Sequence, residues 1–399
     1  MSLDKRPLIV FGEDWGRHPS STQHLALRLA RRRDILWINS IGLRRPRLSL
    51  GDARRLLHKG RRLLTRRDAQ PNGPAVPKAA RLKVVDATAL PFPASTMARR
   101  LNRRIIPASL APARTALPGR RPIVWCSLPS AVDAIGGLDA AATVYYAGDD
   151  FTALSGVDHR PVARMEHELV DRADLVLAAS EPLLARFPAQ KSRLLTHGCD
   201  LELFSTPAPR APDMPTGRPI AGFYGSLSDW LDVDLLAGLA RRLPDWNIVL
   251  IGDVRCPLDD LPALPNVHLL GPRPHAALPA YLQHWQAALL PFRDTPQIRA
   301  CNPLKLREYL ASGTPVVATP FPAATAYGEH LSLSGSLDGF VRAVLEAPHD
   351  PAARRRARQV SVARESWEHR AAEVEDLLCR FDPPAGAATC HGASLQCAA

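Results

Sequence analysis

Short apolar segments alternate with helical patterns along most of the chain, and this order constrains the fold more than any single motif. The apolar segments are continuous, as expected of parallel strands covered on both faces of a sheet. They fall into two blocks, separated by the proline-rich stretch TPAPRAPDMPTGRP at 206–219. The predicted strands are 8–12, 35–39, 82–88, 122–128, 142–148 and 174–180 in the first block, and 220–226, 247–253, 267–271, 287–292 and 315–320 in the second. We therefore expect an α/β protein with two parallel-sheet domains.

The two blocks also give the domain boundaries. A chain of 399 residues is long enough for two domains, each with its own core. We expect the first domain over 1–205, a linker over 206–219 and the second domain over 220–365. A helical segment follows at 366–381, and residues 382–399, which show no periodicity, are expected to form a loose tail.

Cysteine usage and the apolar runs predict the cellular compartment. The seven cysteines are scattered without a CxxC pair, which favours a reducing compartment over a disulfide framework or a zinc site. The apolar run near the start is too short for a signal peptide, and no stretch approaches the roughly 20 apolar residues of a membrane span. We therefore expect a cytoplasmic protein.

The charge is concentrated at one end of the chain. Residues 1–121 hold 27 Lys and Arg against 7 Asp and Glu, whereas the remainder holds 24 against 32. Such a basic block attracts nucleic acid, an anionic membrane or a pyrophosphate-linked lipid, unless it is an ordinary solvated surface. The stretch 44–67 puts leucines on one face of a predicted helix rich in Arg and Lys, which favours docking on anionic lipid. No recognisable nucleic-acid module supports the nucleic-acid alternative, so no such partner is expected.

The stretch NPLKLREYLASGTPVVATP at 302–320 has the pattern of a helix that binds an anion. Asn302 is a good N-cap and Pro303 suits the first helical position, while Gly313 predicts the end of the helix. The first turn offers backbone N–H groups and the positive end of the helix dipole, to which Lys305 adds a full charge. Glu308 lies one turn below, where a carboxylate can accept hydroxyl protons from a sugar. This arrangement predicts a nucleotide site; the alternative is a surface helix whose charged side chains merely face water.

Acidic side chains follow two predicted strands of the first domain. The loop after 8–12 lacks the GxGxxG pattern, and its carboxylates would repel a dinucleotide, which disfavours a dehydrogenase. Asp149 and Asp150 end the strand at 142–148, where open α/β sheets bind ligands. They either orient an acceptor hydroxyl or cap the next turn, and Asp150 is the stronger candidate. If the protein transfers a group to an acceptor hydroxyl, Glu13 and Asp150 are the candidate catalytic residues on the acceptor side. The candidate acceptor-binding residues are Asp14, Trp15, His18 and Asp149.

The segment Asp232-Val-Asp234 spells a DxD motif, a pattern associated with metal binding in other folds. Here it stands at the start of a predicted helix, where acidic residues suit the helix dipole. We therefore predict no metal site.

The second block resembles the donor domain of GT-B glycosyltransferases of family 4, through FYGSLSDW, VLIGD, NVHLLGPRPHAALPAYL, LLPF and PLKLREYLASGTPVV. The resemblance implies a GT-B fold of two Rossmann-like domains facing a cleft, with 366–381 crossing back to the first domain. It implies that Lys305 neutralises the donor diphosphate and that Glu308 binds ribose. The other donor-binding residues it implies are Gly225, Ser226, Gly252, Arg273, Arg293, Asn302, Pro303 and Leu304.

The chain departs from the family pattern at two positions. The family usually has a second Glu eight residues before the ribose Glu, and that position is Ala300 here. The Arg that often follows the first glycine loop is absent after Gly225, and Arg293 or Arg299 could replace it. The first departure leaves open an inactive nucleotide-binding scaffold of a polysaccharide assembly complex as the alternative function.

The first-domain segments GEDWGRHPSSTQHL and LWINSIGLRRPRLS resemble bacterial exopolysaccharide and teichuronic acid glycosyltransferases. This kinship implies transfer from a UDP- or GDP-sugar to a saccharide or polyprenyl-diphosphate-linked acceptor, with retention of configuration and without a metal or other cofactor. It places the reaction in exopolysaccharide or cell-envelope synthesis, at the inner face of the cytoplasmic membrane.

Overall fold

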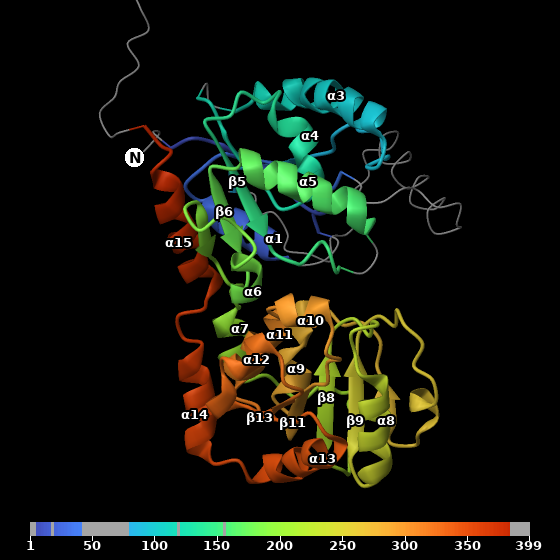
Figure 1. Ribbon diagram of the computed structural model, residues 1–399. Helices are drawn as coiled ribbons and strands as arrows, with labels where there is room; N and C mark the ends of the chain where they lie inside the picture. Colours follow the sequence, from blue (N-terminus) through green and yellow to red (C-terminus); the bar gives the residue numbers. More distant parts are fainter. Residues whose placement is uncertain (1–4, 17–19, 42–79, 118–119, 155–156, 384–399) are drawn as a thin grey trace, which may run out of the picture.

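The computed structural model describes residues 5–16, 20–41, 80–117, 120–154 and 157–383. These residues form two α/β domains, one above the other, with helices of the chain's last part running along one side of both (Figure 1). The predicted basic helix at 44–67, the predicted acceptor residue His18 and the tail from 384 lie outside the described residues.

The first domain is built on a parallel sheet with the strand order β3-β2-β1-β4-β5-β6-β7. Its strands are β1 (Leu8–Phe11), β2 (Ile35–Ile38), β3 (Leu82–Val85), β4 (Ile123–Cys126), β5 (Ala142–Ala147), β6 (Leu175–Ala178) and β7 (Ser192–Leu194). The strand order reverses between β1 and β4, which pair directly. Ligands of open α/β sheets bind beyond the carboxyl ends of the strands at such a reversal.

Helices cover both faces of this sheet, which explains the continuous apolar strands. They are α1 (Ser21–Leu29), α3 (Thr96–Arg114), α4 (Val132–Ile135), α5 (His159–Arg172) and α6 (Glu181–Leu184). The next helix, α7 (Leu201–Ser205), packs on the core of the second domain through Phe204. Within β1, Leu8 and Val10 join a core with α1, while Ile9 and Phe11 join a second core with α3, α4 and α5. Each strand therefore contributes to two cores.

The second domain repeats the architecture with the strand order β10-β9-β8-β11-β12-β13, again entirely parallel among the described pairs. The strands are β8 (Ile220–Tyr224), β9 (Asn247–Ile251), β10 (Val267–Leu269), β11 (Ala287–Leu290), β12 (Val316–Ala318) and β13 (Ser332–Leu333). The helices are α8 (Val233–Arg242), α9 (Pro279–Leu282), α10 (Pro296–Ala300), α11 (Leu304–Ser312), α12 (Pro322–Thr325) and α13 (Leu337–Glu346). The order reverses between β8 and β11, directly beside α11.

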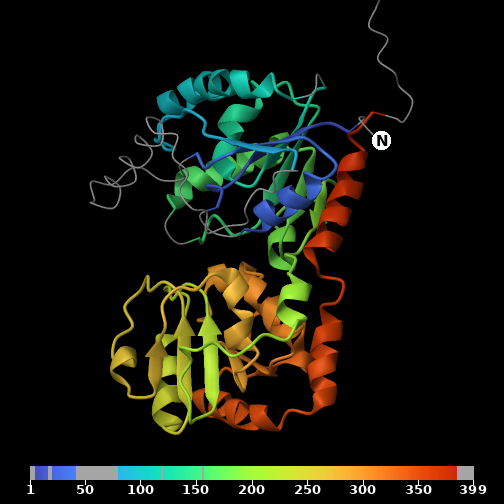
Figure 2. The ribbon, with the colours of Figure 1, turned by 180° about the vertical axis from the view of Figure 1, so that it is seen from behind.

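The chain returns to the first domain through its last two helices, α14 (Ala352–Ser361) and α15 (Trp367–Cys379). Seen from behind, α15 lies beside α1 (Figure 2). Trp367 is 2% exposed and belongs to the core of the first domain. A Cβ atom on Gly198 would lie 2.6 Å from the Trp367 ring, so this crossing requires a glycine. No described helix combines the length and apolar character needed to cross a bilayer.

Arg33 fastens α15 to the first domain. Its guanidinium is buried, and Nη2 lies 2.9 Å from the Glu375 carboxylate and 2.6 Å from that of Asp382. Removing one partner of a buried ion pair leaves the other charge buried and uncompensated, which destabilises the protein.

We predict that Arg33→Ala lowers the free energy of unfolding by about 3 kcal/mol, measured by urea denaturation. Lys5, which also contacts Glu375, compensates only part of the loss. The control is Arg81→Ala, which removes an exposed pair with Asp34 and should cost less than about 1 kcal/mol. Equal losses in the two variants would contradict this role of Arg33.

Candidate nucleotide-sugar site

The predicted anion-binding helix is present as α11, but its start differs from the prediction. Pro303 is the N-cap and the helix begins at Leu304, so the prediction that Asn302 caps the helix is wrong. The Asn302 side chain instead donates from Nδ2 to the carbonyl of Ala179 in the first domain (2.7 Å) and accepts from Arg307 Nη1 (2.6 Å). The predicted stop is confirmed, because Gly313 has φ 74° in the left-handed region.

Lys305 lies in the first turn of α11, surrounded by aromatic rings. Its Nζ atom is 4.8 Å from the ring centre of Trp230, 5.1 Å from that of Phe223 and 5.6 Å from that of Phe292. The faces of these rings attract the ammonium and hold it in place. Burial lowers the pKa of Lys305, and the nearby Glu308 carboxylate opposes this shift. The ammonium is therefore held in a setting that a further anion would stabilise.

Glycine loops at the ends of β8 and β9 lie against this lysine. Gly225 has φ 134°, and a Cβ atom there would lie 2.7 Å from the Lys305 Nζ. Gly252 has φ 145°, and a Cβ atom there would lie 1.9 Å from the Gly225 carbonyl oxygen. Both positions therefore require glycine on grounds of backbone conformation and of space. The result is a surface of bare backbone beside a cation, with the half-buried Ser226 next to it.

Glu308 lies one turn after Lys305, and two side chains hold its carboxylate. Tyr224 OH donates to Oε2, and His275 Nε2 lies 2.7 Å from Oε1. Burial alone would raise the pKa of Glu308, but the His275 and Tyr224 hydrogen bonds outweigh it and hold the pKa below its ordinary value. Burial lowers the pKa of His275, but Glu308 outweighs it and raises the pKa overall. A carboxylate has about four lone-pair sites, so two remain for ligand hydroxyls.

Sequence reasoning missed both residues that orient Glu308. Tyr224 is the last residue of β8, directly before the glycine loop, and His275 follows β10 in the segment GPRPHAAL. An aromatic hydroxyl and an imidazole at the ends of two strands of one sheet, β8 and β10, were the available signal. It could not be interpreted without knowing that both strand ends adjoin α11.

The predicted donor-side arginines already have partners, including Arg299, which pairs with the exposed Asp294 (2.6 Å). Arg273 donates to Tyr281 OH (2.9 Å) and pairs with Asp213 (2.6 Å) in the linker. Arg293 follows Phe292, and its guanidinium is 3.6 Å from Asp234 and partly exposed. Their roles toward a nucleotide stay predictions.

The predicted acceptor side consists of carboxylates at strand ends of the first domain. Burial raises the pKa of Glu13 to about 7, with Asp149 and Asp14 adding to the rise. Asp149 follows β5, and its pKa is raised by burial and by Asp150. Burial raises the pKa of Cys301 to about 12, and Asp149 adds to this shift. Asp149 therefore lies within electrostatic reach both of Glu13 and of the residues leading into α11.

Three other predicted acceptor residues have local partners. Burial would raise the pKa of Asp150, but hydrogen bonds from Thr152 and Arg186 outweigh it and lower the pKa. Asp14 accepts from the hydroxyl of Ser40 (2.6 Å). The Trp15 ring makes an edge contact with a neighbouring tryptophan, with ring centres 4.8 Å apart.

The two domains meet at the residues that precede α11. Ser180 Oγ donates to the Ala300 carbonyl (2.7 Å), and the Ala300 side chain is buried in the core of the first domain. The position where the family usually has a Glu therefore serves domain packing here. A cavity of about 480 Å³ lies beside this contact, between the two domains, and its lining includes Thr196, Asn302 and Arg307.

Among the described residues, one grouping has the side chains of a metal site: Glu375, Cys379 and Asp382. Its two carboxylates bind Arg33, as described above. The DxD segment lies at the start of helix α8, as expected. The Asp232 side chain caps this helix by accepting a hydrogen bond from the backbone N–H of Leu235.

Comparison with known proteins identifies the fold. Residues 218–350 match the family model described as Glycosyl transferases group 1. The structure is similar to that of Anabaena HepE in complex with UDP and glucose, with a TM-score of 0.65 and 14% identity, covering 94% of this chain and 99% of that one. This chain has the GT-B fold, with a group 1 glycosyltransferase domain at 218–350.

Other relatives share this GT-B fold or part of the sequence. A glycosyltransferase from Rickettsia africae has a TM-score of 0.61 and 11% identity, covering 95% of this chain and 99% of that one. A teichuronic acid biosynthesis glycosyltransferase, TuaH of Bacillus subtilis, is 30% identical over 188 residues, which are 43% of this chain. The chain spans about half of that protein, 47% of its length.

We predict that Glu13→Gln stabilises the protein at pH 8 and leaves stability unchanged near pH 4. Because the pKa of Glu13 is raised to about 7 from 4.5, the wild type loses stability as pH rises through this range. The neutral amide avoids the loss, with an expected gain of about 1–2 kcal/mol after allowing for solvent contact. Urea denaturation at both pH values measures it.

The control for this titration is Glu329→Gln, because the Glu329 side chain is 86% exposed. It should leave the pH dependence unchanged. A Glu13→Gln variant that follows the wild-type curve at every pH would show that Glu13 is ionised and well solvated in the native protein.

Proposed function

We propose that this protein is a glycosyltransferase that moves a sugar from a UDP-sugar to a saccharide or polyprenyl-diphosphate-linked acceptor. One observation carries the proposal: Lys305 and Glu308 lie one turn apart at the start of α11, and glycine backbone from β8 and β9 adjoins the lysine. A cation with a carboxylate below it and bare backbone beside it suits a diphosphate joined to a ribose.

The diphosphate would bind at the first turn of α11. The N–H groups near Leu304 and the positive end of the helix dipole favour an anion, and the Lys305 ammonium adds a full charge. As the bond to the sugar breaks, negative charge builds on the leaving diphosphate, and the same groups stabilise it. Binding of the anion also favours the protonated form of Lys305, whose pKa burial lowers. Asn302 and Pro303 would shape this turn, and Arg293 would supply a second cation.

The nucleoside would lie along the ends of β8, β9 and β10. Glu308 would accept the ribose hydroxyls, since Tyr224 and His275 use only part of its lone pairs. Gly225, Ser226 and Gly252 would let the ligand approach the backbone, and we retain Arg273 as a candidate contact for the base. Uracil is the favoured base, because the similar HepE structures contain UDP and UDP-glucose.

The acceptor would approach from the first domain. Asp149 and Glu13 are the favoured carboxylates for orienting its hydroxyl, since Asp149 is electrostatically coupled to Cys301 beside α11. Asp150 is a weaker candidate than the sequence indicated, because Thr152 and Arg186 occupy it. Asp14, Trp15 and His18 remain candidate contacts for a saccharide. Retention of configuration and the absence of a metal requirement are part of the proposal, through kinship with family 4.

The process we infer is synthesis of a cell-envelope or exopolysaccharide, supported by the similarity to TuaH. An acceptor on a polyprenyl diphosphate would put the reaction at the cytoplasmic face of the membrane, with the basic 44–67 region as a candidate contact. The alternative is a nucleotide-binding scaffold without turnover, which the packing of Ala300 into the first domain keeps open.

We predict that UDP stabilises the wild type and not Lys305→Ala in a thermal-shift panel of UDP, GDP, ADP, NAD and a DNA oligonucleotide. A ligand at 100 times its Kd adds about 2.7 kcal/mol of stability. The rate of sugar transfer or UDP-sugar hydrolysis, measured as UDP released, should fall about a hundredfold in Lys305→Ala. The reason is that a charge contact to the leaving group is lost. Glu308→Gln should weaken UDP binding while keeping the shape of the buried site.

The matched control is Arg242→Ala, which removes an exposed cation from α8 and should bind and react as the wild type does. UDP binding without turnover of any sugar conjugate would favour the scaffold. A shift with NAD or DNA alone would contradict the assigned site.

A further inference from the structure

The helix α3 and the turn before it expose large apolar side chains to solvent. Phe92, Met97 and Leu101 are 46%, 74% and 45% exposed. Ser95, the N-cap of α3, donates its backbone N–H to the Phe92 carbonyl (3.0 Å), so this turn keeps Phe92 close to the helix start. Exposed apolar side chains that are scattered singly need no explanation, whereas three within ten residues form a patch.

Arginines flank these apolar side chains. The helix carries five arginines and no acidic residue. Arg99, which is partly buried, and Arg103, whose side chain is 46% exposed, both pair with Asp133 and Glu168. Arg100 and Arg104 are exposed, and neither has an ion-pair partner among the described residues.

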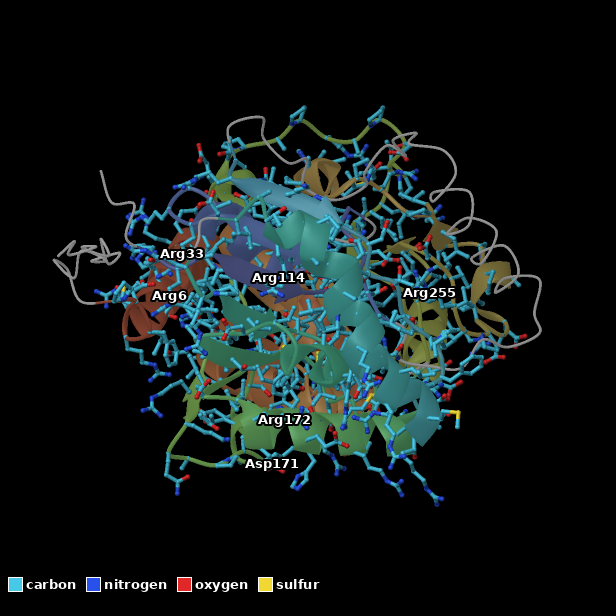
Figure 3. The ribbon with its side chains drawn as sticks, turned by 90° about the horizontal axis from the view of Figure 1, so that it is seen from above. Arg6, Arg33, Arg114, Asp171, Arg172 and Arg255 are labelled. Carbon is cyan, nitrogen blue, oxygen red and sulfur yellow. The ribbon has the colours of Figure 1, made fainter. Side chains whose placement is uncertain are left out.

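The exposed residues share one face of the helix. Leu101 lies four residues after Met97 and Arg104 four residues after Arg100, while the two pairs are offset by three, which puts all four on one stripe. The opposite face, with Ile106 and Leu110, is buried in the core of the first domain. α3 lies across the top of the molecule in Figure 1 and nearest the viewer in Figure 3, on the side away from the second domain.

We propose that this α3 surface, made of Phe92, Met97, Arg100, Leu101 and Arg104, docks on an anionic phospholipid bilayer. The arginines would bind lipid phosphates while the three apolar side chains enter the layer below the headgroups. The basic charge of the first 121 residues also favours an anionic surface, because they carry 27 Lys and Arg against 7 Asp and Glu. A nucleic acid would use the arginines but leave Met97 and Leu101 without a role.

The proposal is independent of the transferase reaction, because it concerns a surface outside the donor site and is measured without substrate. It also differs from docking through 44–67, since all five residues lie in the described part of the chain. Substitutions in α3 should weaken docking through the α3 surface and leave docking through 44–67 unchanged.

The test is co-sedimentation of the full chain with vesicles of phosphatidylcholine alone or of phosphatidylcholine with about 30% phosphatidylglycerol, whose headgroups make the surface anionic. The wild type should bind the anionic vesicles selectively and lose binding at high salt. Arg100→Gln/Arg104→Gln should bind about thirtyfold more weakly. Met97→Glu/Leu101→Glu should abolish binding at any salt concentration, because charged side chains cannot enter the layer.

Arg160→Gln/Arg164→Gln is the matched control, since it removes two exposed arginines from α5 in the same domain. It should bind about as well as the wild type. Thermal melting and UDP binding confirm that each variant is folded. The proposal is overturned if the wild type binds neither type of vesicle, if it binds both types equally, or if the α3 variants bind as tightly as the α5 control.

Discussion

A buried polar network around Arg307 joins the two domains, and the donor side of the site depends on it. Arg307 is 2% exposed and donates to Asn302 and to Glu365, which precedes α15. Asn302 in turn donates to Ala179 at the end of β6. A buried charge of this kind must keep its partners, because losing one leaves an uncompensated ion. The start of α11 is therefore attached both to the first domain and to the crossing segment of the chain.

This attachment gives α11 two distinct sides. Arg307 faces the domain contact, while Lys305 and Glu308 face the strand ends of the second domain. The aromatic rings around Lys305, and the Tyr224 and His275 bonds to Glu308, restrict both side chains before any ligand arrives. Restricting them in advance lowers the entropic cost of binding and keeps their charges in place during the reaction. The same contact brings Asp149 of the first domain within electrostatic reach of Cys301.

The fold could be predicted because it depends on local patterns. The continuous apolar runs predicted every strand of the two described sheets except the short edge strands β7 and β13, and Gly313 predicted the end of α11. Helix bounds are harder to predict, because α3 continues to Arg114 through Pro107 and Pro112. Proline usually ends a helix. Here Pro107 is buried against α4, and a Cβ atom on Gly137 would lie 2.5 Å from its ring, so tertiary packing decides.

The site was only partly predictable for the same reason. Lys305 and Glu308 stand in one helix at a fixed spacing, which a sequence shows directly. Asn302 fits an N-cap in isolation, but it serves the other domain instead, and Tyr224 and His275 reach Glu308 only through the sheet order. The sequence could not show which of the neighbours Asp149 and Asp150 is available to a substrate. Arg186, 36 residues after Asp150, donates a hydrogen bond to Asp150, and this contact depends on the fold.

Hydrogen–deuterium exchange of the full chain with and without saturating UDP would locate the nucleotide without assuming a substrate. We expect slower exchange in the loops at 225–226 and 252–253 and in the first turn of α11, with little change at α3. Slower exchange confined to the first domain, or no change in α11 despite bound UDP, would contradict a nucleotide site at α11.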